Sequence, residues 1–388
     1  MKRRRRRRRL ITWYFCAAAV MSPTLWAAEW SAQPSADVQV EYNDNLRLLP
    51  GHAGDAVGGV LNAGLRMKRA DERGYLSLTP TLRATRYDSR ESLDSDDQVL
   101  KAEWSRRGEY STWRVDAAWT RDTTLTSELE VSGLVQARKR RLLRYLAPSF
   151  SYVPSPRTTL GVNTAYTAVE YQNARFTGLV DYTYASADLS WSYQWSEQTA
   201  VTGVVYATRL DAGLIANRTD TTGMQLQLHS ALSERWNAEA SAGVRHSDDG
   251  KGIVGQDADG WLAKLDLSRQ DESGQWRLMI SRSVDPSGTG VLVQRDQWLV
   301  TREQALTEQW RLTASGQWSV NQDLPPLAAS SDRDYRSAYL RLSRVLTPAW
   351  SVYAAYSYAW QEYTGALGQA ERNAVMLGVH YSGTPVTE

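Results

Sequence analysis

Residues 232–245 read LSERWNAEASAGVR and hold the two features that decide the fold. The first four residues form a polar turn, and Trp236 follows it directly. From Trp236 to Arg245, apolar residues then alternate with polar or small ones, which is the period of a β-strand with one apolar and one polar face. A short turn followed by tryptophan and an alternating strand predicts a sheet whose strands begin at a common level.

The same arrangement recurs along the chain. Turns of this kind also end at Trp276, Trp310 and Trp350, at spacings of 40, 34 and 40 residues. Each spacing matches two strands of about ten to twelve residues joined by one short and one long connection. The candidate long connections are residues 88–97, 123–139, 248–258, 321–332 and 364–370. Regular alternation of short turns and long polar loops is typical of transmembrane β-barrels.

Period-two alternation extends from residue 36 to residue 381 and predicts the whole architecture. We expect an all-β fold, a single transmembrane antiparallel β-barrel of about 18 strands (16–18). An even strand number puts both termini on the periplasmic side, and residues 28–35 are expected to form a short periplasmic arm within a single 28–388 domain. A soluble β-sandwich or propeller also alternates, but it does not explain aromatic residues at the strand ends.

The N-terminal segment predicts export. Lys2 and seven arginines at 3–9 precede an apolar stretch at 10–20 and small residues at Ala27 and Ala28, the order of a secretory signal peptide. We therefore expect residues 1–27 to be a cleaved signal peptide, with the cut after Ala27 or Ala28. A retained signal anchor and a basic nucleic-acid patch are the alternatives.

The composition excludes further classes of protein. The chain has 45 Lys+Arg and 43 Asp+Glu, and removal of the eight signal positives leaves 37 against 43, so no nucleic-acid partner is expected. The mean hydropathy of −0.49 and the lack of a long apolar run beyond the signal argue against spanning helices. The chain nevertheless carries 16 Trp and 20 Tyr against 3 Phe, which suits a barrel wall with interfacial aromatics.

The sequence contains no motif typical of catalysis, metal binding or cofactor binding. The only cysteine, Cys16, lies in the signal, and the four histidines are scattered, so neither a metal nor a cofactor is expected. His246, Ser247 and Asp248 are the one local cluster that resembles a catalytic set. Adjacent strand residues point to opposite faces, so we do not expect an enzyme.

The polar face of the strands is predicted to line a wet lumen, because barrels of 16–18 strands are wide enough for an aqueous channel. Arginine binds carboxylates and phosphates, so these side chains either attract anionic solutes or brace the wall through ion pairs. The lumen-facing candidates are Glu41, Asn43, Arg66, Arg83, Glu103, Arg114, Asp116, Arg245, Lys264, Asp266, Arg277, Arg311 and Arg341.

The apolar face is predicted to contact lipid in a bacterial outer membrane. Tryptophan and tyrosine prefer membrane interfaces, so the tryptophans after the short turns are expected to form a periplasmic girdle. The expected partners are outer-membrane lipid, lipopolysaccharide and the barrel assembly machinery. The girdle candidates are Trp113, Trp236, Trp276, Trp310 and Trp350.

One short motif carries a resemblance. Tyr42-Asn43-Asp44-Asn45 follows the first strand, and together with the repeated Ser/Thr-x-x-Trp turn it resembles the outer-membrane β-barrel porin families of proteobacteria. Some of those barrels are associated with exopolysaccharide export. The resemblance thus implies a conduit for exopolysaccharide that works with a periplasmic polysaccharide-export partner. From the residues alone, the motif is explained by an Asx turn that needs no ligand.

Two other functions remain open. One is a general or anion-biased diffusion porin for small solutes, and the other is a structural or adhesive outer-membrane protein. A loop folded into the lumen would favour the porin.

Overall fold

The computed structural model describes residues 28–51, 54–88, 93–127, 139–173, 177–213, 217–248, 258–324, 332–363 and 368–387. The predicted signal peptide, residues 1–27, lies outside these ranges. Central parts of the loops predicted at 88–97, 123–139, 248–258, 321–332 and 364–370 also lie outside them.

The described residues form nineteen strands and one short helix, α1 (Thr124–Ser127). The strands are β1 (Glu29–Asn43), β2 (Ala56–Asp71), β3 (Gly74–Asp88), β4 (Ser95–Arg107), β5 (Ser111–Thr123), β6 (Arg140–Ser155), β7 (Thr158–Gln172), β8 (Tyr182–Gln194), β9 (Thr199–Ala212), β10 (Asn217–Ala231), β11 (Trp236–Asp248), β12 (Ala258–Asp271), β13 (Gly274–Pro286), β14 (Leu292–Ala305), β15 (Trp310–Leu324), β16 (Arg333–Val345), β17 (Trp350–Tyr363), β18 (Gln369–Ser382) and β19 (Val386–Thr387).

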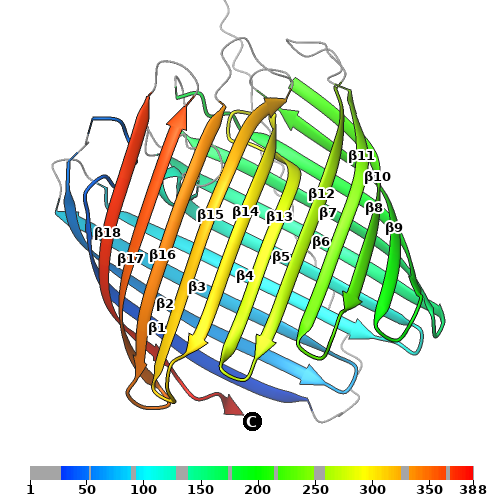
Figure 1. Ribbon diagram of the computed structural model, residues 1–388, viewed down its shortest axis with the longest axis horizontal. Helices are drawn as coiled ribbons and strands as arrows, with labels where there is room; N and C mark the ends of the chain where they lie inside the picture. Colours follow the sequence, from blue (N-terminus) through cyan, green and yellow to red (C-terminus); the bar gives the residue numbers. More distant parts are fainter. Residues whose placement is uncertain are drawn as a thin grey trace, which may run out of the picture.

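Strands β1 to β18 close into a barrel. Each pairs antiparallel with its neighbours in the chain, and β1 pairs with both β2 and β18, which seals the sheet (Figure 1). Closure gives every spanning segment a backbone partner on both sides, which is what a strand needs in lipid. The prediction of a single antiparallel barrel of about 18 strands is confirmed.

The first strand is longer than predicted. The expected periplasmic arm at 28–35 is wrong over most of its length, because β1 already begins at Glu29 and pairs with the end of β2 through Ala70. On its other side, β19 continues β18 after a shift of one residue and pairs with Ser31 and Ala32. Apolar residues alternate with polar ones here as well, at Trp30, Ala32 and Pro34, although proline is disfavoured within strands. The two chain ends therefore hold each other in the sheet.

The connections alternate in length as predicted. Every even-numbered strand from β2 to β16 leads into the next by a short turn, and these turns lie at one end of the barrel with the C-terminus (Figure 1). The other connections lie at the opposite end. In barrels of this class the short turns are periplasmic and the longer loops are extracellular, so we name the two ends accordingly.

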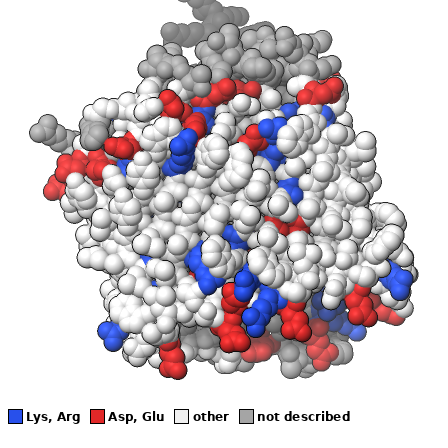
Figure 2. All heavy atoms as spheres, in the orientation of Figure 1, with Lys and Arg blue, Asp and Glu red and all other residues white. Residues whose placement is uncertain are grey.

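The outside of the barrel is apolar. Strand positions of one parity carry exposed apolar side chains, such as Val38 and Val40 on β1, Leu226 on β10 and Leu377 on β18. Figure 2 shows that charged groups on one face lie mainly towards the two ends, with a largely uncharged surface between them that a few charged groups interrupt. Such a belt is the surface that a bilayer core covers. Among the described residues, no helix has the length and apolar character needed to cross a membrane.

Candidate functional site

Strand residues of the opposite parity line a polar lumen. On β10 and β11 the pairs Gln225–Gly243 and Gln227–Ser241 face inward, whereas the neighbouring Leu226–Ala242 pair faces the bilayer. Arg114 and Arg277, both on the inner face, each leave 50% of the side-chain surface exposed. Exposure of charged groups on the inner wall means that this part of the lumen is not packed solid.

The register places the predicted lumen residues together on this inner face. Arg66 and Arg83 follow the same parity as Asn62 and Thr81. Arg311 pairs with Ser343, and Arg341 pairs with Thr313. The same holds for Glu41, Asn43, Glu103, Arg114, Asp116, Arg245, Lys264, Asp266 and Arg277. Whether these side chains act on a solute stays a prediction.

Several charged side chains on the inner face form ion pairs with one another. Across β11, β12 and β13, Lys264 Nζ lies 3.0 Å from Glu239 Oε1, and Arg277 Nε lies 3.0 Å from Asp266 Oδ1. On β5, Arg114 Nε lies 2.8 Å from Asp116 Oδ2. These side chains are partly water-exposed, so each pair contributes little to stability. Their charges cancel locally, and they add little net field to the lumen.

Other inner cations have no such partner. Within the described part of the chain, Arg66, Arg83, Arg311 and Arg341 form no ion pair. The Arg341 guanidinium instead lies 3.7 Å from the centre of the Tyr353 ring, a cation–π contact that keeps its charge. These arginines lie on β2, β3, β15 and β16, in the half of the wall that contains the β1–β18 seam.

Tyr353 connects the strands at the junction of β1 and β18. Its ring lies over Gly378 of β18, where a Cβ would be 2.3 Å from Tyr353 Cζ. Its hydroxyl reaches β1, 3.0 Å from Asp37 Oδ1 and 2.9 Å from Gln39 Oε1, and donates to one of them. One side chain therefore spans β17, β18 and β1 at the point where the barrel closes.

Two extracellular loops meet inside the mouth. The β7–β8 loop and the β13–β14 loop touch where Val180 N donates to Gly288 O at 2.8 Å. Gly290 has a φ of +79° and approaches so closely that a Cβ would lie 2.9 Å from Ala212 Cβ. A side chain there would be strained and obstructed. The contact is sealed by a buried apolar cluster: Val169, Tyr171, Leu179, Val180, Tyr182, Leu210, Ala212 and Leu292.

The β1–β2 loop folds inward as well. Asn45 N donates to Asn43 Oδ1 at 3.1 Å, so the motif at 42–45 does form the expected Asx turn. Leu48, fully buried and at a φ of +52°, packs on Tyr335 and Ala359 of the inner wall. These inward loops were not predicted. The available signals were apolar pairs within polar loops, Leu48 with Leu49 and Leu179 with Val180.

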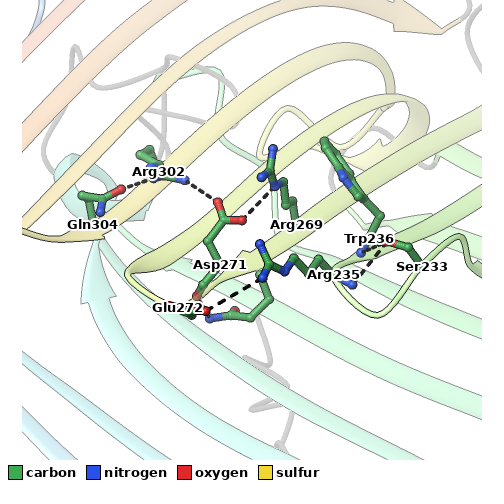
Figure 3. A network of polar contacts seen from close by, with 9 residues as sticks. Ser233, Arg235, Trp236, Arg269, Asp271, Glu272, Arg302 and Gln304 are labelled. Carbon is green, nitrogen blue, oxygen red and sulfur yellow. Dashed lines mark hydrogen bonds and ion pairs between the residues drawn. The ribbon is translucent and has the colours of Figure 1, made fainter.

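The predicted girdle lies at the periplasmic rim. Trp113, Trp236, Trp276, Trp310 and Trp350 all lie within the first three residues of a strand that follows a short turn, on the outer face. An arginine accompanies several of them. Figure 3 shows Arg269 beside Trp236, with Asp271 accepting from Arg269 at 2.9 Å and lying 3.7 Å from Arg302. Trp236, Arg269, Trp276 and Arg302 form one cross-strand row.

A second outer row of tryptophans lies nearer the extracellular end. Trp298 and Trp318 stack with ring centres 4.5 Å apart, and Arg282 lies 4.0 Å from the centre of the Trp261 ring. Two aromatic rows that flank an apolar belt are the pattern of a membrane-spanning barrel. Aromatic residues are expected at both interfaces, but the sequence predicts individual residues only for the periplasmic row, because the second row follows no repeated turn.

Comparisons with known proteins identify the fold. No family model matches the chain, and neither does any curated protein sequence. Among solved structures, Pseudomonas aeruginosa OccK2 (OpdF) is 12% identical and superposes with a TM-score of 0.51 over 91% of this chain and 98% of that chain. The same protein in complex with glucuronate is 11% identical, with a TM-score of 0.50 over 91% and 98%. Acinetobacter baumannii OccAB2 is 10% identical, with a TM-score of 0.49 over 91% and 97%.

The closed 18-stranded wall, its apolar belt and its two aromatic rows define the class of protein. The chain is an outer-membrane β-barrel with the fold of a porin. It is located in the bacterial outer membrane.

Proposed function

We propose that the barrel is a passive channel for small hydrophilic solutes, with a preference for anions. The observation that carries this proposal is a polar, water-exposed lumen whose extracellular mouth is narrowed by inward-folded loops. A constriction of this kind selects by size and charge while leaving a path for water and ions.

The unpaired inner cations support an anion preference. Arg66, Arg311 and Arg341 keep their charge, whereas the acidic Asp116, Glu239 and Asp266 are engaged in ion pairs. The facing wall of β8 to β10 is lined mainly by uncharged groups, such as Ser190, Thr202 and Gln227. A surplus of positive charge on one wall raises the local concentration of anions.

The solute class follows from size and charge. A solved structure of similar fold is described as a complex with glucuronate, a small carboxylate. That ligand belongs to the other protein, but small carboxylates of this kind fit the part of the wall that carries the unpaired arginines. We therefore name small organic anions as the first solutes to test.

The exopolysaccharide-export conduit is the less favoured function. It rests on the resemblance of residues 42–45 and the Trp turns, and the Asx turn already accounts for the motif. Inward-folded loops at the mouth also narrow the path that a polymer would need. The lipid, lipopolysaccharide and assembly-machinery partners remain proposals, and a periplasmic export partner belongs only to the conduit function.

Neutralising two inner arginines tests the anion preference. A unit charge about 7 Å from a permeating ion in water contributes roughly 0.6 kcal/mol, close to the thermal energy, before salt screening. We expect the Arg311→Gln, Arg341→Gln double variant to lower the chloride-to-potassium permeability ratio about two- to three-fold. The measurement is the reversal potential of planar bilayers in a KCl gradient.

The matched control is Arg344→Gln, which removes the same charge from the outer rim beside Trp310. Its permeability ratio is expected to equal that of the parent protein. Equal ratios in the parent and the double variant would refute the anion preference, while conductance itself would still support a channel.

A further inference from the structure

A small, partly open cavity lies between the inner wall and the inward-folded loops. Its volume is about 170 Å³. The wall contributes residues from β1, β3, β4 and β18, and Leu46, Leu93 and Leu125 come from the β1–β2 loop, the β3–β4 loop and α1. The lining is Glu41, Asn43, Leu46, Arg83, Thr85, Tyr87, Leu93, Ser95, Leu125 and Arg372.

Three buried donors around this cavity have no hydrogen-bond partner among the residues that the structure describes. They are Arg83 Nε, Arg372 Nε and Thr85 Oγ1, and Thr85 itself is only 4% exposed. Buried polar groups are nearly always hydrogen-bonded, and an orphaned group indicates an occupant that the protein atoms do not supply. Three such donors on one cavity indicate an acceptor inside it.

The charges show what kind of acceptor fits. Glu41 is the one carboxylate in the lining, and it already accepts from Asn43 Nδ2 at 2.9 Å and lies 3.4 Å from Tyr87 Oη. Asp97, the cross-strand neighbour of Arg83, does not line the cavity and forms no ion pair with Arg83. Its carboxylate has other contacts, although its buried Oδ1 accepts no hydrogen bond from the described residues. Two guanidinium groups against one carboxylate leave one positive charge in the lining.

We propose that this cavity binds one small monovalent anion, a halide or a short carboxylate, between Arg83, Arg372 and Thr85. Guanidinium N–H groups make strong, charge-assisted hydrogen bonds to anions. The anion would join β3 to β18 beneath the β1–β2 loop and α1, and so hold these extracellular segments against the wall. The proposal does not depend on channel activity.

Bromide is the probe for the test. Crystals of the detergent-solubilised full chain in sodium bromide should show an anomalous peak within hydrogen-bond distance of both Arg83 and Arg372. Density for water alone at that position would overturn the proposal.

A solution measurement complements the crystal. We expect the unfolding temperature of the parent protein to rise and saturate with bromide at constant ionic strength, with the bulkier gluconate as the balancing anion. Thr85→Val removes one donor at nearly constant volume and should shift the saturation to several-fold higher bromide. Arg372→Met should abolish it.

The matched control is Arg344→Met on the outer rim, which should retain the saturable rise. A rise that is unsaturable, or equal in Thr85→Val and the parent, would show a general salt effect and overturn the proposal. If Arg372→Met fails to fold, Thr85→Val and the crystal still decide the outcome.

Discussion

Replacement of residues 287–291 by a two-residue Asn-Gly turn is expected to raise single-channel conductance at least about two-fold, because the lumen of an 18-stranded barrel is far wider than a mouth crossed by loops. This segment supplies Gly288 O and Gly290 to the contact with Val180 and Ala212. Without it, the β7–β8 loop loses its partner and the constriction opens. Conductance steps in planar bilayers measure the effect.

A milder change tests the same contact without altering loop length. Gly290→Val puts a Cβ against Ala212 at a backbone conformation that favours glycine, so we expect an intermediate rise in conductance. Gly203→Val is the matched control, since a Cβ at Gly203 meets nothing within 4 Å on the outer face. Unchanged conductance in the shortened-loop protein would show that these loops do not limit the pore.

Gly378→Val is expected to destabilise the closed barrel. The valine side chain takes the space of the Tyr353 ring, and displacement of that ring also breaks the hydroxyl contact with Asp37 and Gln39. Overpacking and the lost hydrogen bond together are expected to lower the free energy of unfolding by about 3 kcal/mol. Urea unfolding in lipid vesicles, followed by the heat-modifiable band on gels, measures the loss.

Two further variants separate the effect of overpacking from that of the lost hydrogen bond. Tyr353→Phe keeps the ring and removes only the hydroxyl, so its cost should be about 1–2 kcal/mol. Gly316→Val adds the same side chain where a Cβ meets nothing within 4 Å, and it should leave stability unchanged. A Gly378→Val protein as stable as Gly316→Val would show that Tyr353 does not hold the seam.

The wall of this protein is predictable because its signals are local. Alternation over a dozen residues fixes which side chains face lipid, and the turn before Trp236 fixes the level of the strand. One face of each strand must be buried in lipid, so a shift of the strand register by one residue would turn the polar face towards the lipid. For the same reason, positions such as Arg311 and Lys264 could be placed on the inner face from parity alone.

The mouth was not predictable in the same way. The contact of Val180 with Gly288 joins loops more than a hundred residues apart, and no period marks either loop. Tyr353 shows a related limit: parity places it on the polar face of its strand, but only the closed barrel shows that its ring lies over Gly378. Parity identifies the face on which a residue lies, whereas its partners depend on how distant strands meet.

Planar-bilayer recording of the purified, heat-modifiable protein shows whether a folded barrel of this chain conducts ions. We expect discrete conductance steps with a reversal potential that favours chloride over potassium. Folded protein that inserts into the bilayer and gives no conductance would contradict this expectation.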